Sequence, residues 1–174
     1  GIIIKGDAAG DNMGRSVSSA GDVNGDGVFD MIVSANLGND GGTDAGEAYV
    51  IFGGSGLDHI DLTNITLTDG FIIQGDANAD EAGQSVSTAG DVNGDGFDDI
   101  LIGARRADPN GSNSGESYVI FGKASGFAAS LELSSLNGTN GFILNGIDAG
   151  DLSGHMSSAG DINGDGFDDI LIGA

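Results

Sequence analysis

The chain has 174 residues, of which 34 are glycine, 27 are aspartate or glutamate and only 5 are lysine or arginine, giving a formal net charge of −22. Nucleic acids and anionic membranes are bound mainly through lysine and arginine, so this balance argues against both partners. The longest apolar runs are a few residues each, which predicts no membrane span. The absence of cysteine excludes a disulfide scaffold and thiol catalysis.

Four kinds of short segment return along the chain in a fixed order, with a period of about 70 residues. An apolar segment comes first, at 1–6, 70–75 and 141–146. A segment of small residues follows, at 16–20, 85–89 and 155–159. After a glycine-rich loop, a third segment lies at 30–35, 99–104 and 169–174, and a fourth lies at 46–53 and 115–122. These recurrences define repeat units at 1–69, 70–140 and 141–174, the last one truncated.

Each segment is rich in isoleucine, valine, phenylalanine or tyrosine, or in small β-formers, and is bounded by glycine, asparagine or aspartate. This composition is typical of strands joined by turns, and the segments are too short and too interrupted by glycine for stable helices. The small side chains at 16–20 and 85–89 indicate a crowded inner strand. The stretch 54–69 is the least repetitive and is expected to be a long loop.

Four antiparallel strands per repeat predict an all-β chain built of β-propeller blades. A parallel β-helix would need much shorter coils, and immunoglobulin-like sandwiches would need about seven strands per 100 residues. The third repeat is one residue short before its small-residue strand. We place the gap in the preceding loop, because a slip inside a strand would turn every side chain to the other face. Met156 then takes the position of Val86.

The loop between the second and third segments carries the pattern Asp-x-Asn-x-Asp-Gly-x-x-Asp in all three repeats. Alternate oxygen-bearing side chains around a glycine turn converge on one point, and oxygen donors without histidine or cysteine favour calcium. The seventh residue would contribute its backbone carbonyl. The sequence therefore predicts three calcium sites, with ligands Asp22, Asn24, Asp26, Val28 and Asp30; Asp91, Asn93, Asp95, Phe97 and Asp99; and Asp161, Asn163, Asp165, Phe167 and Asp169.

Without a cation such a loop is electrostatically unfavourable, since two carboxylates 4 Å apart repel by about 4 kcal/mol at an effective dielectric constant near 20. A structural metal is thus expected. Aspartate, asparagine and glycine are also ordinary turn formers, but recurrence of the whole pattern favours the metal. An EF-hand loop closes with an acid at position 12, which here is Val33, Ile102 or Ile172. The ninth-position aspartate must close the site instead.

The sequence resembles the FG-GAP repeats of the integrin alpha-subunit propeller and its bacterial relatives. The matching elements are the nine-residue loops, Phe-Gly at 52–53 and 121–122, and Gly-Ala at 103–104 and 173–174. The resemblance implies a seven-bladed propeller with its calcium hairpins on one face and adhesion or ligand binding on the other. It leads us to expect an extracellular or cell-surface module that recognises a protein or a carbohydrate.

The chain departs from this pattern in two places and in length. Ser34 replaces the glycine of Gly-Ala in the first repeat, and Val28 with Phe29 replaces the Phe-Asp of the other loops. Two and a half repeats are fewer than the roughly four blades that a closed propeller needs. Open strand edges at both ends would then pair with further repeats of a longer chain or with other copies in a homo-oligomeric ring.

Catalysis is not expected, because His59 and His155 do not recur in the other repeats and no Gly-x-Ser-x-Gly elbow is present. The alternatives to a recognition module are a structural, self-assembling repeat and the non-catalytic propeller of a secreted hydrolase. Arg105 with Arg106 could engage an acidic partner or could be a solvated loop tip.

A second set of acids recurs ahead of the small-residue strands, and the sequence leaves its role open. It could bind a second cation or a sugar, or simply form solvated turns. Glu47 and Glu116 also repeat and are expected only to begin a strand. The recurring pairs are Asp7 with Asp11, Asp76 with Asp80, and Asp148 with Asp151.

Overall fold

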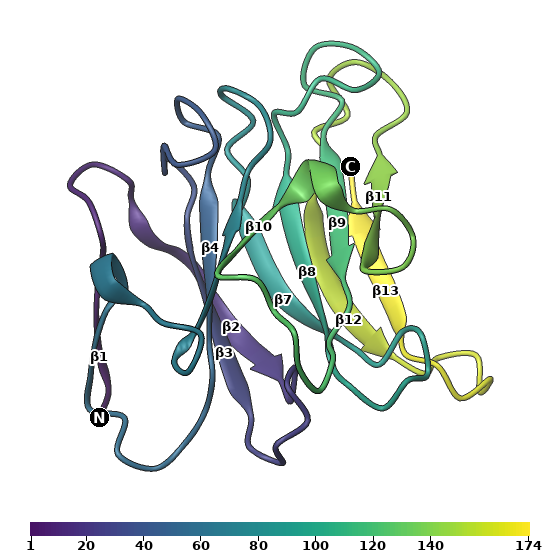
Figure 1. Cartoon of the computed structure of the whole chain (residues 1–174). Helices are drawn as coiled ribbons and strands as arrows, with labels where there is room; N and C mark the ends of the chain where they lie inside the picture. The colour runs from purple at the N-terminus through teal and green to yellow at the C-terminus, as the bar shows by residue number, and fades with distance from the viewer.

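A computed structural model describes all 174 residues. Three blades stand side by side in it (Figure 1), and each begins with an antiparallel meander. The first blade contains β2 (Met13–Gly21), β3 (Asp30–Ala35), β4 (Glu47–Ile51) and β6 (Gly70–Gln74). The second contains β7 (Ser85–Gly90), β8 (Asp99–Ala104), β9 (Glu116–Ile120) and β11 (Gly141–Asn145). The third contains β12 (His155–Gly160) and β13 (Asp169–Gly173). The chain is therefore all-β and forms part of a propeller.

Each four-stranded blade takes its outermost strand from the following repeat unit. β6 pairs antiparallel with β4, with Phe71 opposite Val50, and β11 pairs in the same way with β9. The blades are thus offset by one strand from the sequence repeats 1–69, 70–140 and 141–174. The register also confirms the placement of the one-residue gap, because Met156 lies opposite Ile172 just as Val86 lies opposite Ile102.

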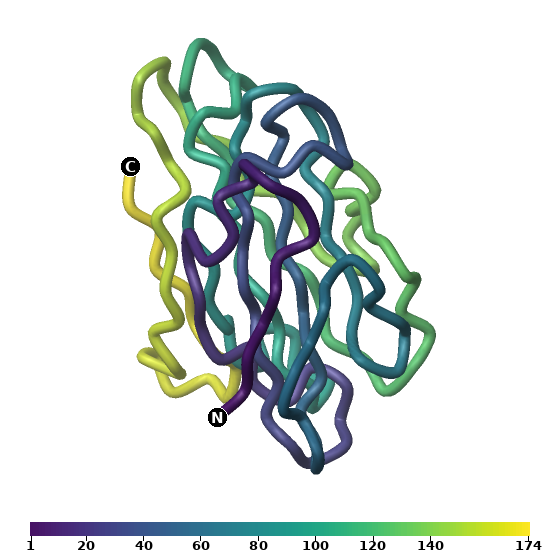
Figure 2. Tube along the Cα trace, turned by 90° about the vertical axis from the view of Figure 1, so that its left-hand side faces the viewer, coloured from purple at the N-terminus to yellow at the C-terminus, as the bar shows by residue number.

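The stretch 54–69, expected to be a long loop, contains β5 (His59–Asp61) and a single 3₁₀ turn, η1 (Leu62–Asn64). The second repeat has the equivalent β10 (Ser130–Glu132) and η2 (Leu133–Ser135). β10 pairs parallel with β6 at the outer edge of the preceding blade, and β5 pairs likewise with β1 (Ile3–Lys5). Each repeat therefore adds a short strand to the blade before it. Figure 2 shows β1 running along the side that faces the viewer.

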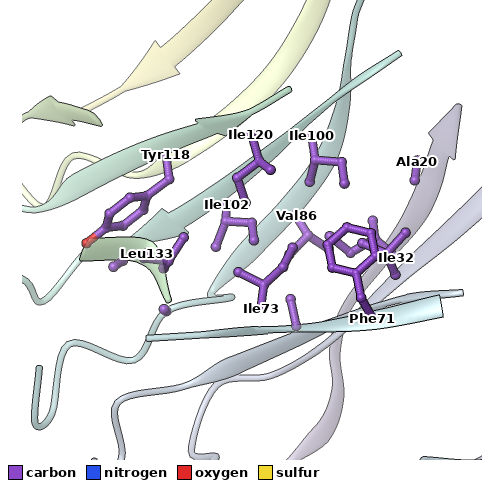
Figure 3. Close-up of a cluster of buried hydrophobic side chains, with 14 of the residues drawn as sticks. Ala20, Ile32, Phe71, Ile73, Val86, Ile100, Ile102, Tyr118, Ile120 and Leu133 are labelled. Atoms are coloured by element: carbon purple, nitrogen blue, oxygen red, sulfur yellow. The ribbon is translucent and has the colours of Figure 1, made fainter. Parts of the chain in front are cut away.

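The largest core lies between the first two blades rather than within either one. Side chains from the facing sheets interdigitate there (Figure 3), and the 3₁₀ residue Leu133 closes the cluster at 0 % exposure. The labelled members are Ala20, Ile32, Phe71, Ile73, Val86, Ile100, Ile102, Tyr118, Ile120 and Leu133. A smaller cluster around Leu101 and Val119 packs the second blade against the third. Stacking of neighbouring blades therefore buries both faces of the second sheet, whereas Ile60 of β5 and Leu62 of η1 cover Tyr49 and Ile51 on the outer face of the first.

Small side chains let the innermost strands approach closely, as the sequence predicted. Val86 donates its backbone N–H to Ser16 Oγ at 3.2 Å across the first two blades. Ser85 Oγ donates to the Gly154 carbonyl at 2.6 Å across the next pair. A Cβ on Gly103 would overlap that same carbonyl, which explains the glycine of the Gly-Ala element.

Exposure shows what each position gains from a neighbouring blade. Val17 is 67 % exposed on the first inner strand, whereas the equivalent Val86 is 6 % exposed between blades. Leu171 is 57 % exposed on β13, whereas the equivalent Leu101 is 0 % exposed on β8. Ile172, on the face toward the second blade, is 37 % exposed where the equivalent Ile102 is 1 % exposed, because the third blade has only its two inner strands here. None of the helical turns is long and apolar enough to cross a membrane.

These exposures predict unequal effects for the same substitution at two equivalent positions. Ile102→Ala should lower the free energy of unfolding by roughly 2–5 kcal/mol, because it leaves a cavity in the inter-blade core. Ile172→Ala should cost less than about 1 kcal/mol, because its site is already partly hydrated. Urea unfolding of both variants measures the difference. Equal losses would contradict the inter-blade core.

Candidate metal-binding loops

The three acidic loops occupy equivalent hairpins, at the end of the innermost strand of each blade. They join β2 to β3, β7 to β8 and β12 to β13, and all lie at the lower edge in Figure 1. Because equivalent strands of successive blades run in the same direction, the loops follow one another along this edge. The aspartate at position 5 is exposed in all three loops, and the asparagine at position 3 is half-buried in the first two and exposed in the third, so a cation could reach both.

Two glycines give each loop its tight turn. Gly25 and Gly27 have φ angles of 73° and 85°, in the left-handed region that side chains with a Cβ rarely adopt. Their counterparts in the second loop, Gly94 and Gly96, have φ angles of 75° and 90°. The third loop repeats the geometry. The glycines of the motif are therefore conformational requirements of the loop.

The side chains at positions 1, 3 and 5 fold inward onto the backbone of their own loop. Asp22 accepts the N–H of Asp26 at 3.0 Å and of Gly27 at 2.9 Å, through different carboxylate oxygens. Asn24 Oδ1 accepts the Asp26 N–H at 2.9 Å, and Asp26 Oδ1 accepts the Val28 N–H at 2.8 Å. The other loops repeat these bonds. These hydrogen bonds orient the ligand-bearing side chains within each loop.

The same backbone donors stabilise the charged form of the first aspartate. In the third loop, hydrogen bonds from the N–H groups of Gly166 above all, and of Gly164 and Asp165, hold the pKa of Asp161 below its ordinary value. An ionised carboxylate at the first position is the form that a divalent cation needs.

The ninth-position aspartate performs a structural task that the motif alone did not reveal. Asp30 accepts the Val23 N–H at 2.9 Å with one oxygen and the Gly53 N–H at 2.8 Å with the other. Asp99 does the same with Val92 at 3.0 Å and Gly122 at 2.9 Å. The carboxylate therefore ties the loop to the Phe-Gly element at the end of the third strand.

The hydrogen bond between Asp30 and the Phe-Gly element requires the glycine of that element. A Cβ on Gly53 would overlap the carbonyl of Phe29, so only glycine can bring its N–H to Asp30. Phe52 beside it packs against Phe71, with ring centroids 6.0 Å apart, and anchors the element in the core. The recurrence of Phe-Gly and of the ninth aspartate thus has one physical cause.

The loops fit calcium by donor chemistry and by charge. Asp99 is fully buried, and burial raises its pKa to about 7. Asp99 belongs to neither ion pair of the structure, which join Lys5 to Asp61 and Arg106 to Glu81, so its carboxylate has no cationic side chain as a partner. A cation in the loop would supply that charge. The groups of three acids with oxygens within 4.8 Å of one another lie outside the loops, so ligation by the fifteen residues stays a prediction.

Those acidic groups lie at the end of the blades opposite the loops. Each combines an aspartate pair whose role the sequence left open with a glutamate that was expected only to begin a strand. They are Asp7, Asp11 and Glu47, and Asp76, Asp80 and Glu116. Glu47 is buried and accepts the Tyr49 hydroxyl at 2.6 Å, and Glu116 accepts that of Tyr118. The recurring Glu-x-Tyr spacing was the available signal. Glu47 and Glu116 therefore do more than begin a strand.

The remaining sequence candidates have plain structural positions. Asp151 accepts the backbone N–H of Asp148 at 2.8 Å, as a turn residue does, and this pair joins no third acid. Arg106 pairs with Glu81 at 2.7 Å. His59 and His155 are exposed, on β5 and β12.

The acids opposite the loops predict a pH dependence of the metal-free protein. Burial, and then the charge of Asp76, raise the pKa of Asp80 to about 6. Between its ordinary pKa and this value the folded state binds more protons than the unfolded state, so the free energy of unfolding should fall as pH rises from about 4 to about 7. Urea unfolding in a chelator measures this slope. Asp80→Asn should reduce the slope without abolishing it, because Asp99 also has a raised pKa, whereas Asp58→Asn, at an exposed position, should leave it unchanged. Equal slopes in both variants would refute the assignment.

Comparison with known proteins agrees with this arrangement. A sequence profile described as FG-GAP repeat matches residues 13–51, 82–120 and 157–174, together more than half of the chain. The chain is 31 % identical to integrin alpha-PS2 of Drosophila melanogaster over 128 residues, covering 71 % of this chain and 9 % of that protein. It is 31 % identical to integrin alpha-PS5 of the same organism over 184 residues, covering 99 % of this chain and 16 % of that protein. The chain thus spans a small part of these relatives.

The matched segments correspond to the three inner strands of the first two blades, to the two strands of the third, and to the acidic loops between them. Sequence motif, strand topology and similarity therefore point to one conclusion: the chain belongs to the FG-GAP repeat family.

Proposed function

We propose that this chain is a calcium-stabilised, non-catalytic propeller module that works outside the cell or at its surface and binds a protein ligand. The observation that carries the proposal is the threefold recurrence of one loop geometry. Each loop presents oxygen donors only, fixed by the same backbone hydrogen bonds, above a carboxylate that lacks a cationic partner. Calcium is the common divalent cation that oxygen-only loops suit.

The stabilising role follows from where the loops attach. Asp30 and Asp99 each join a loop to the third strand of the blade, so a cation bound there reinforces contacts across the sheet. A cation that binds the folded state alone adds about 2.7 kcal/mol per site when its free concentration is 100 times the Kd. Extracellular calcium modules have Kd values of roughly 10⁻⁴–10⁻³ M, and loops of this affinity would be filled outside the cell, where we propose that the chain works.

The ligand surface is proposed at the end opposite the loops, where the resemblance to integrin alpha subunits also implies binding. This end carries the two acidic groups around Glu47 and Glu116, which suit a ligand with basic side chains. Large aromatic side chains, which pack well on sugar rings, are strongly exposed only at Phe29 and Phe167 in the loops. The observation favours a protein over a carbohydrate.

A structural, self-assembling role is the second candidate. Val17 on one outer face and Leu171 on the other are 67 % and 57 % exposed, although their equivalents between blades are buried. Copies that stack through these faces would bury them. A solution mass above that of the monomer, measured at micromolar concentration without any ligand, would favour this candidate over recognition.

Calcium should raise the thermal stability of the chain. We expect the Tm in 2 mM Ca²⁺ to exceed that in a chelator by about 5 °C or more, since each kcal/mol shifts the Tm by roughly 2–4 °C at this size. Asp91→Ala with Asp95→Ala should reduce the gain, and Asp58→Ala should not. A Tm that is the same in calcium and chelator would contradict the calcium assignment.

Binding can be tested with arrays of extracellular-matrix proteins and of glycans. The fluorescently labelled chain should bind protein spots in calcium and lose that binding in a chelator. Asp7→Asn with Asp76→Asn, at the more exposed members of the two acidic groups, should weaken it. Binding to glycan spots alone, or binding that ignores both calcium and these aspartates, would overturn the proposed recognition.

A further inference from the structure

Neighbouring loops are joined directly to one another by a pair of hydrogen bonds that we term a clasp. Asp98, at the eighth position of the second loop, accepts the backbone N–H of Asp22 at 2.7 Å through its carboxylate. The backbone N–H of Asp98 donates to the carbonyl of Asp22 at 3.2 Å. Asp22 is the first ligand predicted in the first loop. Both backbone groups of one loop's first ligand are thus held by the next loop.

The same clasp joins the second loop to the third. Asp168 accepts the N–H of Asp91 at 2.9 Å and donates its own N–H to the carbonyl of Asp91 at 3.1 Å. Two independent occurrences with the same atoms show that the contact belongs to the repeat.

A ring contact lies beside each clasp. The Phe97 ring covers Gly25 so closely that a Cβ there would overlap it, and Phe167 covers Gly94 in the same way. A Cβ on Gly21 would likewise overlap the Asp98 carboxylate. The glycine that precedes each of the first two loops and the glycine at its fourth position therefore leave room for side chains of the following loop.

The position of the clasp along the chain connects two sites. Asp98 lies between Phe97 and Asp99, which are predicted to bind the cation of the second loop through a carbonyl and a carboxylate. A cation there would fix the conformation of all three residues. It would thereby also fix the backbone of Asp22 and the turn at Gly25.

We propose that the clasps couple the loops, so that calcium binding at neighbouring loops is positively cooperative. This inference rests on the proposed calcium sites. The first cation orders the clasp, and the second then binds a loop whose backbone is already ordered and loses less conformational entropy. By linkage the effect is reciprocal, so each loop raises the affinity of the other by the same factor.

The first loop marks one limit of the coupling. Its eighth residue is Phe29, which is 74 % exposed and carries no acceptor for a neighbouring backbone. The first loop therefore receives a clasp from the second but carries no clasp residue of its own. We expect coupling between the first and second loops and between the second and third.

Calorimetric titration with Ca²⁺ alone tests the coupling in a chain that keeps two loops. Asp161→Ala with Asp165→Ala disables the third loop of the full chain. We expect two ions to bind, the second at least about fivefold tighter than the first after statistical correction. Adding Asp98→Ala should leave two ions that bind independently. Asp98→Asn retains an acceptor oxygen and should retain coupling, and Asp58→Ala matches the charge change away from the loops.

A second measurement leaves the clasp intact, in case Asp98→Ala impairs folding. Asp26→Ala disables the first loop, and the calcium affinity of the second loop should then fall by the coupling factor measured in the first titration. Two ions that bind independently in the parent chain, or coupling that survives Asp98→Ala, would overturn the inference but not the calcium sites. No bound ion in the unmodified chain would overturn the proposed function itself.

Discussion

A buried carboxylate at the base of each complete hairpin is the interaction on which the rest of the structure depends. Asp30 and Asp99 are 2 % and 0 % exposed, and each divides its two oxygens between its own loop and the Phe-Gly element of the third strand. Their hydrogen bonds are satisfied but their charge is not, since neither has a cationic side chain. A charge buried without a partner is costly, which is the physical case for a cation in the loop.

Stacking of blades gives these local sites a collective character. The principal core lies between sheets, so a blade is complete only against its neighbour, as the contrast between the buried Leu101 and the exposed, equivalent Leu171 shows. The loops follow the same rule, because Asp98 and Asp168 hold the backbone of the preceding loop. Sheet packing and loop contacts therefore repeat in register, and an event at one hairpin can reach the next without passing through the core.

Much of this arrangement could be predicted from the sequence. Strand segments, the inner position of small residues and the register of Met156 followed from recurrence, because a period of about 70 residues repeats every local constraint. β5 and β10 were missed, since three residues are too few for an alternating pattern. The group around Glu47 was also missed, because loop residues Asp7 and Asp11 meet Glu47 only once the strands of the repeat have folded together. The clasp of Asp98 was missed because it joins residues of different repeat units, which only the stacking of blades brings together.

The most direct test of the account is a crystal structure of the calcium-loaded chain, with the ions located by their anomalous scattering. The account predicts one ion in each loop, bound by oxygens of the first, third, fifth and ninth residues and the seventh carbonyl at about 2.3–2.6 Å. Loops without ions at millimolar calcium, or ions found only beside Glu47 and Glu116, would contradict it.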